Sequence, residues 1–127
     1  MSDRVELSIP VRADLVVLAR LTAATVGARA GFDVEEIEDL RLAVDELCLS
    51  MVGRNGSGRF HLTYVGGEDD VEVTCEYEPG AEDHAVYLAE PDDLSIRILD
   101  ALVDEHGRDR TDKPRAWLRK RRTSVGR

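Results

Sequence analysis

The sequence lacks the features that mark a membrane-spanning, secreted or disulfide-stabilised protein. No apolar run approaches the ~18–20 residues that a membrane-spanning helix needs. The N-terminus has no basic segment followed by an apolar stretch, so no secretory signal is evident. Cys48 and Cys75 are the two cysteines, and their separation fits neither a disulfide framework nor a metal motif. We therefore expect a cytoplasmic protein in a reducing compartment, with no membrane as a partner.

Sequence signatures of the common catalytic and cofactor sites are missing as well. His61, His84 and His106 are scattered without metal-ligand spacing, so we expect no metal centre of that kind. Ser50 and Ser57 lie in no nucleophile elbow. The chain carries no phosphate-binding Walker sequence and no Rossmann fingerprint. The residues alone therefore indicate a soluble, acidic α/β interaction domain of unknown activity.

Charge is distributed unevenly along the 127 residues, which carry 26 acidic and 17 basic side chains and a net charge of −9. Residues 106–127 hold nine Lys or Arg against two Asp, so the preceding 105 residues carry a charge of −16. An acidic body repels nucleic acid and attracts a basic protein partner, and we expect no direct binding of nucleic acid. The length fits one domain over residues 1–127, with a basic C-terminal tail from about residue 119.

Hydrophobic periodicity predicts the first two elements. Alternation over residues 5–9, ended by Pro10, predicts a short strand. Residues 12–30, ended by Gly31, predict a helix. Its expected apolar face consists of Val17, Leu18, Leu21, Ala24 and Ala28.

A second helix is predicted from Asp33 onward. Asp33 and Glu36 form a capping-box pattern at its start. Its apolar residues recur at spacings of three and four, which only a helix places on one stripe. They are Ile37, Leu40, Val44, Leu47 and Met51, and Gly53 is the expected terminator.

The next part of the chain predicts a hairpin and a long loop. Two alternating runs, residues 60–64 and 71–77, flank a glycine turn and predict antiparallel strands. Residues 78–91 contain Pro79, Gly80 and Pro91 and indicate a loop, in which an ordered stretch at 86–88 is an open option.

The last part predicts a third helix and one or two strands. The helix is capped by Asp92 or Asp93 and ends before Gly107. A strand follows near residues 114–121, and a further short strand near 106–110 is left open. Three helices on one face of a mainly antiparallel sheet bury all these apolar faces. We therefore expect a two-layer α/β sandwich of the α+β kind.

The second predicted helix carries one dense polar patch, most of which is expected to be a solvated helix face. Arg41 and Asp45 are spaced for an ion pair one turn apart. Glu46 lies beside the apolar stripe near the helix end. A carboxylate there can act as a general base on water or a hydroxyl, and a solvated surface carboxylate is the alternative.

The stretch Asp39–Ser50, which reads DLRLAVDELCLS, resembles the N box of GHKL-fold ATP-binding proteins, specifically of RsbW-type anti-sigma factors. The order of the remaining elements is similar to that of the family. Leu94–Glu105 resembles the final helix of these proteins, and the closing run Arg119–Arg122 resembles their end. The resemblance covers nearly the whole chain, the N box being its most specific part, and it implies the histidine kinase-like ATPase fold.

The resemblance also implies a function. In that family the domain binds a sigma factor and keeps it from RNA polymerase, and a STAS-domain anti-anti-sigma protein competes for the same surface. Active members bind Mg-ATP and phosphorylate a Ser or Thr of this antagonist. The implied partners are therefore a sigma factor and a STAS-domain protein, in the mechanism called partner switching. Members often pair through the sheet region, so a homodimer is an implied option.

Residues that match the family's nucleotide site depart from its pattern. Glu46 matches the N-box Glu, the candidate general base, but Ser50 replaces the Asn that holds Mg²⁺. Glu78 and Gly80 resemble a remnant of the first glycine box, D-x-G-x-G, whereas an ungapped alignment puts Tyr77 and Pro79 at its Asp and first Gly positions. Residues 89–93, at the family's ATP lid, include three acids and no glycine, and acids repel a triphosphate. We therefore expect little or no binding of ATP and Mg²⁺.

Such losses are similar to those of divergent actinobacterial members of the family. The 15 arginines and two lysines of the chain would fit a GC-rich genome. The resemblance thus implies an actinobacterial-like member whose nucleotide-binding motifs are degenerate.

The resemblance places a partner surface on the first helix. Arg20 matches an Arg that lies on the surface shared by the sigma factor and its antagonist. An Arg fork can hold a carboxylate by two hydrogen bonds, and an ordinary solvated arginine is the alternative. Asp14, Val16 and Val17 would share this surface. Since Val16 and Val17 cannot both face the core, one of them should be exposed.

The favoured function is therefore that of an anti-sigma factor, antagonised by a STAS-domain protein and with weak or absent ATP binding. The alternative is an active ATP-dependent serine/threonine protein kinase of the same family, which would use Glu46 as its base. A generic α/β domain with a different role is a third option. The departures at Ser50 and in the lid weigh against enzymatic activity.

Overall fold

The computed structural model describes residues 3–51, 57–80, 93–109 and 114–123. The expectations for Gly53, His84, residues 86–88 and most of the lid segment 89–93 lie outside the described residues. The elements in chain order are β1 (Asp3–Pro10), α1 (Val16–Arg29), α2 (Val34–Leu49), β2 (Gly58–Gly66), β3 (Asp70–Pro79), α3 (Asp93–Leu102), β4 (Glu105–Asp109) and β5 (Arg115–Arg121).

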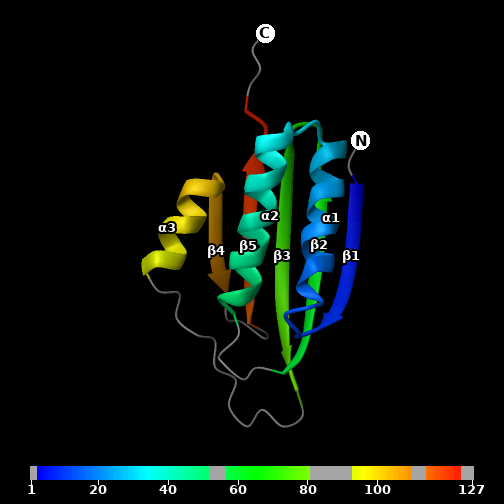
Figure 1. Ribbon diagram of the computed structural model, residues 1–127, viewed down its shortest axis with the longest axis vertical. Helices are drawn as coiled ribbons and strands as arrows, with labels where there is room; N and C mark the ends of the chain where they lie inside the picture. Colours follow the sequence, from blue (N-terminus) through cyan, green and yellow to red (C-terminus); the bar gives the residue numbers. More distant parts are fainter. Residues whose placement is uncertain (1–2, 52–56, 81–92, 110–113, 124–127) are drawn as a thin grey trace.

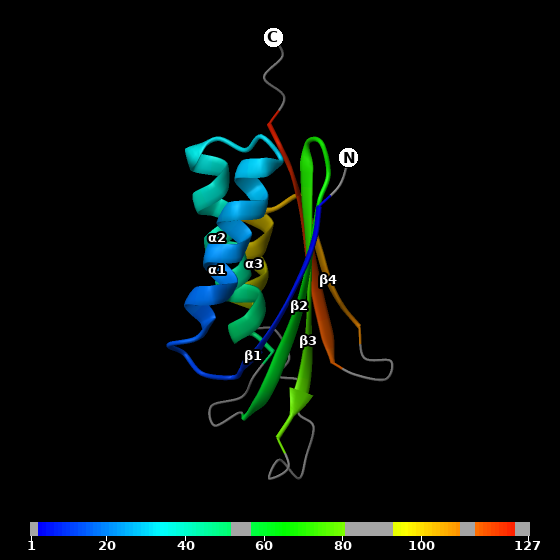
Figure 2. The same cartoon turned by 90° about the vertical axis from the view of Figure 1, so that its right-hand side faces the viewer.

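The five strands form one sheet in the order β1-β2-β3-β5-β4, and every neighbouring pair is antiparallel (Figure 1). All three helices cover the same face of this sheet, and the opposite face carries none of them (Figure 2). The arrangement confirms the expected two-layer sandwich and is consistent with the GHKL fold. The short strand left open near residues 106–110 exists as β4.

The core lies between the sheet and the helix layer. Side chains of β2 and β3 alternate between buried and more exposed positions, as strand geometry requires. The Tyr64 side chain is fully buried, and its hydroxyl donates to the Ala19 carbonyl of α1 at 2.9 Å. Cys48 and Cys75 are buried core residues, with their Sγ atoms 3.9 Å apart. These buried contacts therefore join α1 and α2 directly to β2 and β3, the two strands of the hairpin.

Helix α2 forms as its sequence predicts. The Asp33 side chain accepts from the Glu36 amide, and the Glu36 side chain accepts from the Asp33 amide, both at 2.8 Å. This reciprocal pair satisfies two amide donors that would otherwise lack partners. Leu40, Val44 and Leu47 of the predicted stripe are buried. The stripe therefore packs α2 into the core along its whole length.

The predicted face of α1 is wrong. Val17, Leu18 and Leu21 are exposed, and the helix begins at Val16 rather than near residue 12. The buried residues of α1 are Val16, Ala19, Ala23, Val26 and Gly27. A Cβ at Gly27 would lie 3.2 Å from Leu40 Cδ2, so the small residues let α1 approach α2 and the sheet closely. The spacing of the apolar residues favoured a buried face made of the larger side chains. The close packing of α1 instead leaves these side chains exposed to solvent.

Two boundaries near the C-terminus differ from expectation. Gly107 does not mark the end of α3, which ends at Leu102, but lies within β4 opposite Trp117. A Cβ at Gly107 would lie 2.9 Å from the indole Nε1 of Trp117, which explains why a glycine stands there. The basic tail expected from residue 119 begins inside β5. There Arg119 pairs with Asp70 at 2.8 Å and Lys120 donates to the Leu102 carbonyl at 2.8 Å.

Glu36 connects the start of α2 to the end of β5. Its side chain is 6% exposed and accepts hydrogen bonds from the amides of Asp33 and Thr123. Burial alone would raise the pKa of Glu36, but these hydrogen bonds and the nearby Lys120 outweigh it and hold the pKa below its ordinary value of 4.5. We call this connection the Glu36 clip.

We predict that Glu36→Ala destabilises the protein by about 1–2 kcal/mol, because the amides of Asp33 and Thr123 lose their acceptor. Since the folded pKa lies below the ordinary value, the stabilisation is complete above pH 4.5 and is lost as the pH falls through the folded pKa. Urea unfolding at several pH values measures both effects. The exposed neighbour Glu35→Ala is the control, and an equal loss in the two variants would contradict the prediction.

Candidate functional site

The residues that match the N box meet α3 near the C-terminal end of α2. Glu46 lies on α2, and the Ser95 hydroxyl of α3 donates a hydrogen bond to its carboxylate. Ser95 is 6% exposed, so this contact is part of the packing between the two helices. The candidate general base is thus already in contact with a hydroxyl of its own chain.

Ser50, at the end of α2, directs its hydroxyl back to its own helix. The Ser50 Oγ donates to the Leu47 carbonyl at 2.9 Å. The guanidinium of Arg108, on β4, donates to the Ser50 carbonyl at 2.9 Å. A cation at a helix C-terminus is favourable because it complements the helix dipole. Sequence reasoning missed Arg108, since nothing in the spacing connects residue 108 to residue 50 before the strand is placed beside the helix.

Glu78 lies near the end of β3, and Gly80 directly follows this strand. Glu78 Oε1 lies 2.7 Å from His61 Nε2 of β2, and both side chains are substantially exposed. A Cβ at Gly80 would lie 2.4 Å from the Ser57 Oγ, so Gly80 permits a close approach of these two segments. Glu78 therefore takes part in a surface pair between neighbouring strands.

The residues that match the family's nucleotide site are engaged in contacts within the chain. The Glu46 carboxylate accepts the Ser95 hydrogen bond, and the Ser50 hydroxyl donates to the Leu47 carbonyl of its own helix. Asp93 places an acid in the first turn of α3, where a triphosphate would meet repulsion. Among the residues that the structure describes, no group of three His, Cys, Asp or Glu side chains could hold a metal ion.

The expected partner surface lies on α1. Arg20 Nε is 3.1 Å from Asp45 Oδ1 of α2, and these two atoms are buried without hydrogen-bond alignment. Asp45 thus pairs with α1 rather than with Arg41, which instead contacts Glu38 at 3.6 Å. The Arg20 side chain keeps 33% of its surface exposed and borders the helix face.

Residues near Arg20 divide between the core and the surface. Val16 is 5% exposed and Val17 is 39% exposed, so the expectation that one of the two is exposed is confirmed, and it is Val17. Leu18 and Leu21 are exposed beside it. Asp14 is exposed and accepts from Arg12 at 3.2 Å and 3.1 Å. Val17, Leu18, Arg20 and Leu21 form what we call the α1 face.

Burial sets the ionisation of Asp45. Desolvation raises the pKa of Asp45, and the neighbouring Glu46 raises it further, whereas the positive charges of Arg20 and Arg41 lower it. The balance leaves the pKa above its ordinary value. The surroundings of Asp45 therefore disfavour its ionised form, although Arg20 lies beside it.

No helix within the described ranges is long and apolar enough to cross a membrane.

No family model matches the chain. Its similar proteins include several named serine-protein kinase RsbW. The one from Listeria monocytogenes serotype 4a is 34% identical over 100 residues, which are 79% of this chain and 52% of that protein. Those from Bacillus pumilus and Bacillus subtilis are 29% and 27% identical and cover 81% and 82% of this chain and 76% of each relative. The chain spans about half the length of the Listeria relatives that it matches.

We predict that Asp45→Asn changes the pH dependence of stability. Because the folded pKa of Asp45 lies above its ordinary value of 3.8, ionising this group opposes folding. The unfolding free energy of the wild type should therefore fall, relative to the variant, as the pH rises from 3.8 through the folded pKa. Denaturant unfolding of both proteins over this range measures the difference. A difference that stays constant, or moves the other way, would contradict the assignment.

Proposed function

Because the chain is a distant homologue of the RsbW serine-protein kinases, we propose that it acts as an anti-sigma factor. It sequesters a sigma factor and is antagonised by a STAS-domain anti-anti-sigma protein. Both partners belong to the cytoplasm, where transcription takes place. The observation that carries the proposal is the α1 face, an exposed apolar surface around the partly exposed side chain of Arg20.

The α1 face has the composition of a protein-binding surface. Val17, Leu18 and Leu21 are 39%, 42% and 53% exposed, because the small residues of α1 take the core positions. Arginine is enriched among the few residues that carry most of the binding energy in interfaces, and contacts around such a residue exclude water from it. The net charge of −9 of the chain favours approach of a basic partner.

We further propose that the interaction needs no nucleotide. Glu46 and Ser50 are engaged within the chain, by Ser95 and Leu47, and Arg108 supplies a cation at the end of α2. These contacts support a site that is closed by its own side chains. Regulation would then depend on competition between the sigma factor and the STAS-domain protein.

The alternative is an active serine/threonine protein kinase that phosphorylates the STAS-domain antagonist. Two observations favour it. The relatives bear the name serine-protein kinase, and Glu46 already accepts a hydrogen bond from a serine hydroxyl, as a general base would. The replacement of the magnesium-binding Asn by Ser50 weighs against it.

We predict that Arg20→Ala weakens the complex with a sigma factor or STAS-domain protein about tenfold or more. Each candidate from the same genome is co-expressed with the tagged chain, and the affinity of any complex is measured by calorimetry. Arg29→Ala, at the other end of α1, removes an exposed pair with Asp3 and serves as the control. Failure of the wild type to form any such complex would reject the proposed function. Equal effects of the two variants would reject the role of Arg20.

We also predict that calorimetric titration with Mg-ATP yields no binding heat for the folded wild type. The Ser50→Asn variant should behave in the same way, because Ser95 still engages Glu46. Binding by the wild type, followed by phosphate transfer to a STAS-domain protein, would favour the kinase.

A further inference from the structure

Between α2 and α3 the helix layer is hollowed on its outer side. Figure 1 shows the two helices side by side over the sheet. The hollow has a volume of about 500 Å³. Its lining consists of Leu42, Asp45, Glu46, Leu49, Ile98, Ala101 and Leu102. We call it the α2–α3 groove.

The groove is mostly apolar and open to solvent. Leu42 and Leu49 of α2 are 49% and 58% exposed. They lie seven residues apart, which places them on one side of the helix about two turns apart. Exposed apolar side chains along a groove can receive the apolar face of an amphipathic helix.

The charges of the lining are all of one sign. Asp45 and Glu46 line the groove, and its lining includes no Lys or Arg. Ser95 contacts Glu46 with a neutral hydroxyl, which leaves the negative charge of Glu46 uncompensated at that contact. A phosphate group would be repelled here, whereas a basic side chain would be attracted.

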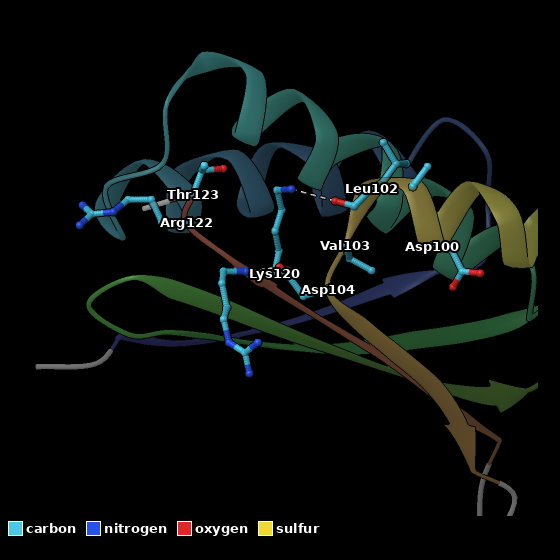
Figure 3. A pocket seen from close by; sticks show the side chains of 9 residues that line it. Asp100, Leu102, Val103, Asp104, Lys120, Arg122 and Thr123 are labelled. Carbon is cyan, nitrogen blue, oxygen red and sulfur yellow. Dashed lines mark hydrogen bonds between the residues drawn. The ribbon is translucent and has the colours of Figure 1, made fainter. Parts of the chain in front are cut away.

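A second hollow, at the ends of α3 and β5, differs in this respect. Figure 3 shows Lys120 reaching from β5 to the Leu102 carbonyl, and Asp100 and Asp104 lie on the α3 side. Lys120 also lies 3.9 Å from Asp39. Its cation is thus engaged by the fold, and this hollow offers no apolar anchors comparable to Leu42 and Leu49. Of the two, the α2–α3 groove is the better docking surface.

We propose that the α2–α3 groove binds an amphipathic helical segment of the protein partner, one with basic residues beside its apolar face. The apolar side chains of this segment pack against Leu42, Leu49 and Ile98, and a basic side chain pairs with Glu46. The inference rests on the proposed function, because it adds a second docking surface beside the α1 face. Asp45 belongs to both surfaces, since it contacts Arg20 on one side and lines the groove on the other.

The test uses the full chain and three fluorescent peptides of about four helical turns. The first is an amphipathic Leu/Lys helix, the second has the same composition in a shuffled order, and the third is a Leu/Glu counterpart of the first. Binding is measured by fluorescence anisotropy at low and at physiological salt. We expect the first peptide to bind about tenfold more tightly than the other two at physiological salt.

Two variants with the same charge change locate the binding site. Leu49→Lys places a cation in the groove and should weaken the first peptide about tenfold. Val34→Lys makes the same change at a position that is 83% exposed at the start of α2, and should leave the affinity within about twofold. Circular dichroism checks that both variants are folded.

Several results would overturn the inference. These are absence of binding, equal binding of the amphipathic and shuffled peptides, or equal loss in the two variants. Self-association of the wild type that Leu49→Lys abolishes would assign the groove to a second copy of the chain. Such outcomes leave the proposed function standing, because complex formation through Arg20 tests that function separately.

Discussion

The close packing of α1 on the sheet is the constraint from which the surface of the helix layer follows. Ala19 and Ala23 have no exposed surface, and the Tyr64 hydroxyl reaches the Ala19 carbonyl at 2.9 Å. Larger side chains at these positions would hold the helix away from the strand and break this contact. The large apolar residues of α1 therefore lie on the outer side, where a partner can cover them.

The sequence predicts most of the architecture because its strongest patterns are local. The alternation of β2 and β3, the capping box of Asp33 and Glu36, and the stripe of α2 each arise within a few residues. The buried face of α1 could not be found in this way, because alanine and glycine give a weak periodic signal. Their role appears only when Gly27 is placed against Leu40. The predicted helix end at Gly107 was wrong for a related reason, since the Trp117 indole that requires a glycine there belongs to the neighbouring strand β5.

The candidate site was predictable in its residues but not in its connections. The N-box resemblance singled out Glu46 and Ser50, yet their partners Ser95 and Arg108 come from elements 49 and 58 residues away. Such long-range contacts depend on how α3 and β4 pack, which no local pattern encodes. Asp45 illustrates the same limit. A one-turn spacing favoured Arg41 as its partner, but helix packing brings Arg20 of α1 closer.

The Glu36 clip has a consequence for the order in which the chain can fold during synthesis. Thr123, which donates to Glu36, lies 87 residues further along the chain, and β5 must enter between β3 and β4 before the sheet is complete. The ribosome therefore releases β1, α1, α2 and the β2–β3 hairpin long before the last strand is available. Until β5 is synthesised, β4 has no neighbouring strand in the sheet, and the Glu36 carboxylate lacks the hydrogen bond from Thr123. The helix layer can form early, but the hydrogen bond that joins the start of α2 to the chain after β5 forms only when synthesis is nearly finished.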